Sequence, residues 1–263
     1  MLAQKGAACM QQVKQLTSIK PPGAVAAIVR AGGPAVQASA RIPDYLHETY
    51  WWAYVHPNAV RLFERQWLVN LILWGNFARL RDAALDALGE RLEGSTLQVA
   101  CVYGDFTPRL AARVPRDAAL DVVDVLPVQL ANLRRKLGDE TRVGLMNRDA
   151  ANLGVPAAAY DRAVLFFLLH EMPEDVRRRT LAEALRAVKP GGRIVIVDYH
   201  LPHAAHPLKP LMSWILRRFE PFAMDLWRRD VSHWMPGIPA GAIAKRTTFG
   251  GLYQQLVIEV PQA

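Results

Sequence analysis

The chain has 263 residues, of which 51% are hydrophobic, and its 32 lysines and arginines outnumber 24 acidic residues to give a net charge of +8. The hydrophobic share argues against a disordered chain, and the presence of only two cysteines argues against a disulfide framework. No apolar run has the length of a membrane-spanning helix. The positive charge favours an anionic partner, which could be a membrane surface, nucleic acid or an anionic ligand.

Residues 1–43 are predicted to form a poorly ordered N-terminal extension. The first 40 residues contain no acidic side chain and are interrupted by Pro21-Pro22-Gly23 and Gly32-Gly33-Pro34. A basic, acid-free composition is typical of a mitochondrial presequence, but serines are few, and a bacterial extension is the other interpretation. The expected location is therefore the cytoplasm, on the inner face of the cytoplasmic membrane, with the mitochondrion as the alternative.

Residues 44–92 are predicted to form a helical, aromatic-rich cover over the ligand edge of the domain that follows. Mainly apolar residues recur every three or four positions, as they do on one face of a helix. They are Leu62, Phe63, Trp67, Asn70, Leu71, Trp74 and Phe77. Just before them, the segment from Tyr50 to Pro57 includes Tyr54 and His56. Its aromatic rings suit either stacking on a flat ligand or packing inside the cover.

Residues 93–263 alternate between apolar strands and helical segments, a pattern typical of parallel βαβ units. Strands are predicted at residues 97–103, 120–125, 160–167 and 194–198. Two further strands, at 243–249 and 252–260, flank Gly250-Gly251 and predict a hairpin. The expected fold is α/β and Rossmann-like, with a seven-stranded, mostly parallel sheet and a C-terminal antiparallel hairpin. This is the architecture of class I S-adenosylmethionine-dependent methyltransferases.

The candidate cofactor site lies where the strands end, because parallel sheets bind ligands outside their carboxyl ends. Asp124 is expected there as an acceptor for ribose hydroxyls or as a helix cap. Asp149 is expected as an adenine contact, a metal ligand or base, or a turn residue. The first loop keeps one glycine, too few for the usual glycine-rich cradle, so altered cofactor chemistry is expected. The predicted cofactor-binding residues are Tyr103, Gly104, Asp105, Asp124, Val125, Asp149, Ala150 and Phe166.

Histidines supply further candidates for proton transfer and metal binding. His170 precedes Glu171 and follows the 160–167 strand at the ligand edge. Three more histidines are spaced by three, but the prolines around them break any helix that would align them. They are His200, His203 and His206. The sequence therefore does not define a set of metal ligands.

Residues 207–229 are predicted to form a long helix that faces a membrane or a quinone. Its apolar residues keep three- and four-residue spacing, with arginines interspersed and Trp214 and Trp227 nearby. A helix of this kind lies on a membrane surface and does not cross it. The competing interpretation is a helix that packs against the flank of the sheet.

Several segments resemble known families. The blocks that resemble the ubiquinone/menaquinone C-methyltransferases are residues 149–150, 160–164 and 188–194. A more specific similarity, to the RquA family of rhodoquinone-biosynthesis proteins, lies in residues 50–57, 63–70, 166–173 and 198–200. Together these segments span most of the chain between Asp44 and Trp234.

The resemblance implies that ubiquinone is converted to rhodoquinone, with a ring methoxy group replaced by an amino group. It implies S-adenosylmethionine as the amino donor and a requirement for Mn²⁺. Candidate catalytic residues for this reaction are Asp149, His56, His170 and Tyr54.

Two other functions are open. One is ordinary methyl transfer to a quinone or another small lipophilic acceptor, and the other is a non-catalytic scaffold that binds S-adenosylmethionine or lipid. A nucleic-acid substrate is not expected, because no base-reading module is recognisable. The sequence does not specify the oligomeric state.

Overall fold

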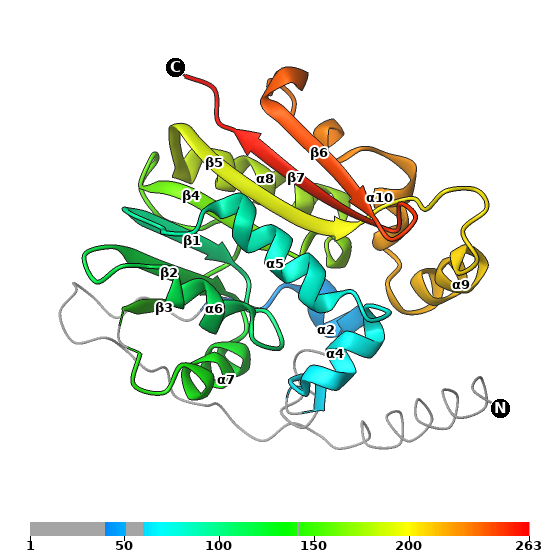
Figure 1. Ribbon diagram of the computed structural model, residues 1–263, viewed down its shortest axis with the longest axis horizontal. Helices are drawn as coiled ribbons and strands as arrows, with labels where there is room; N and C mark the ends of the chain where they lie inside the picture. The colour runs from blue at the N-terminus through cyan, green and yellow to red at the C-terminus, as the bar shows by residue number, and fades with distance from the viewer. Residues whose placement is uncertain (1–39, 51–59, 61, 141, 263) are drawn as a thin grey trace.

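The computed structural model describes residues 40–50, 60, 62–140 and 142–262. They form a seven-stranded sheet of order β3-β2-β1-β4-β5-β7-β6 with helices around it (Figure 1). The strands are β1 (Ser95–Val99), β2 (Ala119–Asp124), β3 (Val143–Asn147), β4 (Tyr160–Phe166), β5 (Val188–Tyr199), β6 (Ile243–Thr248) and β7 (Tyr253–Glu259).

The first five strands are parallel, and β7 is antiparallel to both of its neighbours, β5 and β6. The strand order reverses between β1 and β4, which creates a crevice at their carboxyl ends, where ligands bind in such sheets. The predicted seven-stranded fold with a C-terminal hairpin is therefore confirmed.

The strands differ from the sequence prediction by more than one or two residues in three places. β1 ends at Val99 because Ala100 takes a φ of 71° and turns the chain. β3 had escaped identification because Gly144 interrupts its apolar pattern; a Cβ there would lie 2.1 Å from the Asp121 carboxylate. β5 begins at Val188, since a register shift against β4 absorbs the predicted turn at 188–193 into the strand.

Side chains of alternate residues divide between the two faces of the sheet. Val164 and Phe166 of β4 pack under α5 (Phe77–Leu88), α6 (Phe106–Ala112) and α7 (Pro127–Leu137). Ala163 and Leu165 pack on the opposite face with α8 (Glu174–Ala187). Both faces are thus buried, and ligands have access to the sheet at its edges.

The N-terminal cover consists of separate helices. α2 (Asp44–Tyr50) is followed, beyond a gap in the described residues, by α4 (Gln66–Ile72). The single apolar helix face expected across residues 62–77 is broken between α4 and α5, where Trp74 and Gly75 have φ values of 52° and 77°. Consequently Phe77 is buried, whereas Trp67 and Leu71 are 59% and 63% exposed.

The single helix expected over residues 207–229 is two helices, α9 (Lys209–Phe219) and α10 (Ala223–Arg228). Pro221 lies between them and cannot continue the helix of α9. α10 is buried, including Trp227, whereas α9 exposes Leu211 and Trp214. Within the described part of the chain, every helix is too short or too polar to cross a membrane.

Candidate functional site

The carboxyl edge of the sheet contains two residues with an unusual backbone conformation. Ala100 follows β1 with a φ of 71°, and Phe167 follows β4 with a φ of 53°. Residues other than glycine seldom adopt positive φ, and such strain clusters at functional sites. Since the strand order reverses between these same two strands, this edge is the candidate site.

Asp124 ends β2 and lies buried beneath this edge. Its Oδ2 accepts a hydrogen bond from the backbone N–H of Cys101 and its Oδ1 from that of Leu126, both at 2.8 Å. Burial raises the pKa of Asp124 to about 6, although both hydrogen bonds act in the opposite direction. The Cys101 side chain also donates to this carboxylate, and the acceptor capacity that remains can serve a neighbouring hydroxyl.

Asp149 lies two residues beyond the end of β3. Its Oδ1 accepts a hydrogen bond of 2.8 Å from the backbone N–H of Ala151, which closes a tight turn. The amide of Asn147 donates to the carbonyls of Asp124 and Val125, at 3.0 and 2.9 Å, and ties the ends of β2 and β3 together. Asp149 therefore has a turn role, which leaves its other carboxylate oxygen for a ligand.

Helix α2 lies against the same edge. Leu46 and Tyr50 form an apolar cluster with Leu126, which directly follows the β2 end, and Val125 packs against this cluster. Upstream of the helix, the backbone N–H of Ala40 donates to Asn147 Oδ1 at 3.0 Å. The segment 40–50 thus covers the ends of β2 and β3.

Tyr45 of α2 is a site residue that the sequence analysis missed. Burial raises its pKa first, and the carboxylates of Glu171, Asp149 and Asp124 raise it further. Its hydroxyl therefore lies within electrostatic reach of acids from three different loops. A tyrosine in the cover does not by itself indicate a site residue. Only the folded structure shows that Tyr45 lies near these acids.

The loop after β1 is held by side chains from the cover and from α7. Glu64 accepts from the backbone N–H of Gly104 at 3.1 Å and from Asn132 Nδ2 at 2.6 Å, and it pairs with Lys136 at 2.9 Å. Lys136 also donates to the carbonyls of Val102 and Gly104, at 2.9 and 2.8 Å. Backbone groups that an open glycine-rich cradle would present are therefore already bonded to the protein.

Two predicted cofactor-binding side chains of this loop are engaged elsewhere. Tyr103 accepts a hydrogen bond of 2.7 Å from Gln129, and its ring stacks on Phe63. Asp105 pairs with Arg81 at 2.7 Å and Arg109 at 2.6 Å. Burial would raise the pKa of Asp105, but the two arginines outweigh it and lower that pKa. In this conformation both side chains brace the loop.

Phe166 and Ala150 also have packing roles. The Phe166 ring is buried, with its centroid 4.5 Å from that of Phe106 and 6.2 Å from that of Phe77. Ala150 packs against the core on the opposite face of the sheet. At this edge the two residues therefore contribute mainly through the path of their backbone and not through their side chains.

Gly104 is required by both its conformation and its surroundings. Its φ is +77°, and an added Cβ would lie 3.0 Å from Phe77 Cζ and 3.1 Å from Gln66 Oε1. We expect Gly104→Ala to lower the free energy of unfolding by about 1–2 kcal/mol for the left-handed backbone and by about another 1 kcal/mol or more for the contacts. Thermal unfolding would measure this.

Gly138→Ala is the matched control, because Gly138 has a φ of +54° but no atom within 4 Å of an added Cβ. It is expected to show the backbone cost alone. Equal losses in the two variants would mean that the close approach of α4 and α5 to the loop contributes nothing.

His170 forms a buried pair with Asp198 at the ends of β4 and β5. Its Nδ1 lies 2.9 Å from Asp198 Oδ1, and its Nε2 lies 3.8 Å from Glu171 Oε1. Asp198 also accepts from the backbone N–H groups of Leu169 and Tyr199, at 2.8 and 2.7 Å. These bonds fix the carboxylate, which in turn fixes the orientation of the imidazole through Nδ1.

The charge state of His170 follows from its neighbours. Burial would lower its pKa, but Asp198 outweighs burial, and Glu220 and Glu171 add to the effect, so the pKa rises to about 9. His170 is therefore an imidazolium at neutral pH. It is a hydrogen-bond donor in this state and becomes a base only after losing its proton.

The His170 turn is braced from behind by Arg177, which is fully buried. Its guanidinium donates to the carbonyls of Leu169, Met172 and Phe222, at 2.9, 2.8 and 2.8 Å. Sequence reasoning assigned no role to Arg177 and placed Asp198 only within a family resemblance. The position of Asp198 at the end of a predicted strand was the one signal that could have identified it.

Aromatic rings surround the imidazole. Tyr199 and Phe167 lie edge-on to it, with centroids at 4.9 and 6.0 Å. Tyr253 is in contact with both of these rings, at 5.8 Å from each. The pair is therefore enclosed by aromatic rings, of which Tyr199 and Tyr253 are themselves buried.

Two of the three histidines at 200–206 have structural partners. His200 Nδ1 lies 2.8 Å from the carbonyl of Gly251, and His206 Nε2 lies 3.0 Å from that of Phe249, so both hold the β6–β7 turn. Among the residues that the structure describes, no three His, Cys, Asp or Glu side chains gather as metal ligands would. The described residues therefore do not fit a manganese site. Tyr54 and His56 lie outside the described residues.

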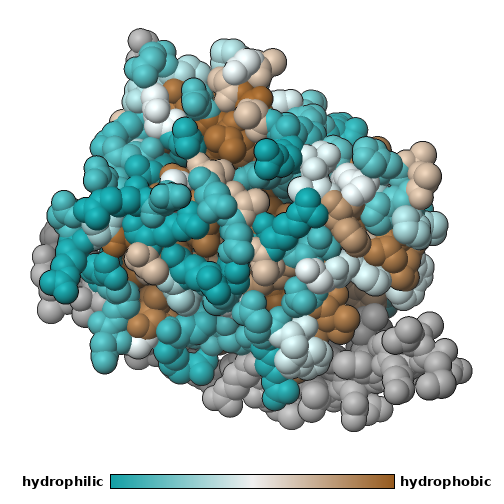
Figure 2. Space-filling view, in the orientation of Figure 1, coloured by the Kyte–Doolittle hydropathy of each residue, from teal (hydrophilic) through white to brown (hydrophobic). Residues whose placement is uncertain are grey.

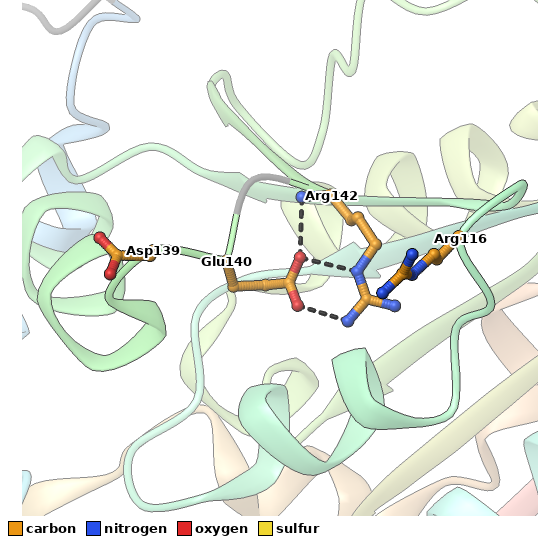
Figure 3. Close-up of a pocket in the computed structure, with 4 residues that line it drawn as sticks. All are labelled: Arg116, Asp139, Glu140 and Arg142. Carbon is orange, nitrogen blue, oxygen red and sulfur yellow. Dashed lines mark hydrogen bonds and ion pairs between the residues drawn. The ribbon is translucent and has the colours of Figure 1, made fainter.

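A second hollow, of about 670 Å³, lies at the opposite edge of the sheet and is lined by Arg116, Asp139, Glu140 and Arg142 (Figure 3). Arg142, just before β3, donates hydrogen bonds to the Glu140 carboxylate from its guanidinium and from its backbone N–H. Hydrogen bonds from Arg142 lower the pKa of Glu140 to about 2. Glu140 and Arg142 neutralise each other, and the hollow lies away from the strand ends that carry Asp124 and His170.

The fold and this edge define the class of protein. A sheet of order 3-2-1-4-5-7-6 with an antiparallel seventh strand is the class I methyltransferase fold. An O-methyltransferase family protein from Burkholderia thailandensis has this fold. It superposes with a TM-score of 0.60 at 17% identity, over 78% of this chain and 60% of that one. At this identity the similarity establishes the fold alone.

Sequence comparison refines the assignment. Residues 96–192 match the methyltransferase domain family. A ubiquinone/menaquinone biosynthesis C-methyltransferase of Syntrophotalea carbinolica is 28% identical over 158 residues, 60% of this chain and 64% of that protein. A carboxy-S-adenosyl-L-methionine synthase of Chromohalobacter salexigens is 28% identical over 136 residues, 50% of this chain and 48% of that protein. Residues 96–192 are therefore similar to the methyltransferase domain family, within a chain that has the class I methyltransferase fold and resembles quinone C-methyltransferases over part of its length.

Proposed function

We propose that the protein converts ubiquinone to rhodoquinone by replacing a ring methoxy group with an amino group, using S-adenosylmethionine. The observation that carries this proposal is the His170–Asp198 pair, enclosed by aromatic rings beside the edge that holds Asp124 and Asp149. A cofactor site and a proton-transfer site would thus share one edge. The similarity to the RquA family supplies the reaction class.

Asp124 and Asp149 are the residues that would hold the cofactor. Asp124 would accept a hydrogen bond from a ribose hydroxyl, and Asp149 one from the adenine amino group, beneath the cover formed by α2. When bound, the cofactor would supply the amino nitrogen. The loop braced by Glu64 and Lys136 supports a methionine arm held differently from that of a methyl donor.

His170 would act on the quinone. Addition of the donor's amino nitrogen to the ring forms a C–N bond and builds negative charge on a quinone oxygen, and loss of methanol then restores the ring. For the amino group to remain on the ring, the N–Cα bond of the donor must also break; an elimination that removes a proton from the donor's β-carbon and returns one to the nitrogen would balance this step and release an unsaturated acid. An imidazolium Nε2–H can stabilise the quinone oxygen and return its proton to the departing methoxy group. In its alternative role Asp149 would not contact adenine and would act as the base for the proton of the attacking nitrogen. No step is assigned to Mn²⁺, because the described residues lack a ligand set for it.

The decisive experiment combines short-tail ubiquinone with cofactor labelled at its amino nitrogen, with and without Mn²⁺, followed by mass analysis of the quinone. The expected product has one methoxy group replaced by a labelled amino group. An unlabelled amino product would contradict the cofactor's role as donor. A quinone left unchanged under every metal supplement would favour the scaffold function.

Methyl transfer to a quinone is the second candidate, favoured by the similarity to the C-methyltransferases. It predicts a methylated quinone and accumulation of S-adenosylhomocysteine in the same experiment. The carboxy-S-adenosyl-L-methionine synthase among the relatives indicates that related sequences are not confined to methyl transfer.

We further propose that the protein works on a membrane surface through an apolar face on α4 and α9. Trp67, Leu71, Ile72, Leu211 and Trp214 are large hydrophobic residues exposed on these two helices. Trp74, just after α4, donates to Met212 Sδ of α9 at 3.2 Å, so the helices are neighbours. Hydrophobic side chains reach the surface over α9 at the right of Figure 2, and Arg217 and Arg218 add positive charge.

Flotation with anionic liposomes tests this proposal. The protein is expected to float at low salt and to dissociate as salt rises, because lipid charge contributes about 1 kcal/mol per basic residue near the surface. Trp214→Ser should weaken binding by removing an interface-seeking ring that the core does not use. Protein that stays in the soluble fraction with excess anionic liposomes at low salt would contradict membrane association.

A further inference from the structure

We infer that the hollow between α4 and the β6–β7 turn is the binding site for the isoprenoid tail of the lipophilic acceptor. The inference rests on the proposed function for the identity of that acceptor as a quinone. The hollow itself is a feature of the fold, and ligand binding to it can be measured without turnover.

The hollow has the size and lining of a site for an apolar chain. Its volume is about 450 Å³, within the roughly 300–1,000 Å³ of small-molecule sites. It is lined by Trp67, Asn70, Leu71, Trp74, Gly75 and Phe249. The lining has no charged side chain and one amide, so it offers dispersion contacts and little else. An unsaturated hydrocarbon chain matches such walls, whereas a charged ligand does not.

A continuous series of aromatic rings connects this hollow with His170. Phe249 stacks on Tyr253 with centroids 6.0 Å apart and an interplanar angle of 18°. Tyr253 lies 5.8 Å from Tyr199, whose ring in turn lies 4.9 Å from that of His170. The β6–β7 turn is at the carboxyl edge because Tyr253 pairs with Tyr199, the last residue of β5. Tyr253 and Tyr199 are buried, so these rings form the core behind the hollow and place it on the same edge of the sheet as His170.

The outer rim of the hollow faces the same way as the exposed apolar face. Trp67 and Leu71 belong to both, and the hydrogen bond from Trp74 to Met212 places α9 alongside. A chain leaving the hollow would thus emerge over Leu211 and Trp214 and not into charged surface. That geometry suits a substrate whose tail extends beyond the protein into a lipid phase.

Binding of geranylgeraniol to the full chain, in mild detergent, tests the hollow without turnover. Leu71→Glu places a charge in the lining, which a bound hydrocarbon chain would have to desolvate, and it is expected to weaken binding at least about tenfold. Ile72→Glu is the matched control, because Ile72 is exposed on the same helix but does not line the hollow. It should bind geranylgeraniol like the native protein.

Kinetics with two quinones separate this inference from the proposed function. Leu71→Glu should raise KM for a long-tailed ubiquinone at least about tenfold and leave turnover of a tail-less analogue unchanged. If Leu71→Glu and Ile72→Glu changed KM equally, the hollow would not be the tail-binding site. Both residues would then belong only to a membrane-facing surface. Native protein that binds geranylgeraniol selectively but converts neither quinone would refute the proposed function while upholding an isoprenoid site.

Discussion

Replacing His170 with Asn is expected to lower kcat/KM for the quinone by about 10²–10⁴, the usual contribution of a positioned proton donor. Asn keeps a donor where His170 Nδ1 meets Asp198 Oδ1 and removes the group at Nε2. Binding of S-adenosylmethionine should stay close to that of the native protein, because Asp124 and Asp149 are untouched. Steady-state kinetics combined with calorimetric titration of the cofactor would measure both.

The pH profile shows whether the pair acts in the reaction or only in folding. With the pKa of His170 near 9, activity that needs the imidazolium should fall as the pH rises through about 9. Asp198→Asn removes the carboxylate that raises this pKa and should move the fall to lower pH. A raised pKa also stabilises the fold below about pH 6.5, and that stability is lost as the pH rises towards 9. An unchanged profile in a folded Asp198→Asn protein would make the pair structural.

Replacing Asp124 with Ala is expected to weaken S-adenosylmethionine binding tenfold or more. A hydrogen bond from a ribose hydroxyl to a carboxylate would be lost, worth about 1.5–3 kcal/mol before rearrangement. Calorimetric titration measures the affinity directly. Affinity equal to that of the native protein would contradict the role of the β2 end as the ribose site.

A structural effect of Asp124→Ala could also weaken cofactor binding, because Asp124 fixes the backbone at Cys101 and Leu126. The pH dependence separates the two causes. Burial raises the pKa of Asp124 to about 6, so its ionised, ribose-accepting form declines below that pH. Affinity of the native protein should fall about tenfold per pH unit below 6, whereas the variant should show no such dependence. A flat native profile would count against Asp124 as the acceptor.

The sequence by itself determined the fold class. Buried strands, intervening helices and a diglycine hairpin each depend on local patterns of two or about four residues, which the chain expresses without reference to distant contacts. For the same reason the sequence correctly placed Asp124 at the end of a strand. It also showed that the first loop contains only one glycine. The ends of the helices were harder to predict from the sequence. Trp74 and Gly75 break the cover because α5 packs on the sheet and α4 does not.

Only the tertiary structure decided which side chains act together. His170 and Asp198 are separated by 28 residues and meet because β4 and β5 are adjacent in the sheet. Glu64 reaches Gly104 and Lys136 only because the cover folds back over the first loop, and that contact redirects the loop from an open cradle to a braced one. Such pairings depend on strand order and packing, which bring together residues whose spacing along the chain carries no signal. The hollow beside Phe249 has the same origin, since α4 and the β6–β7 turn lie at opposite ends of the sequence and form one wall only in the folded chain.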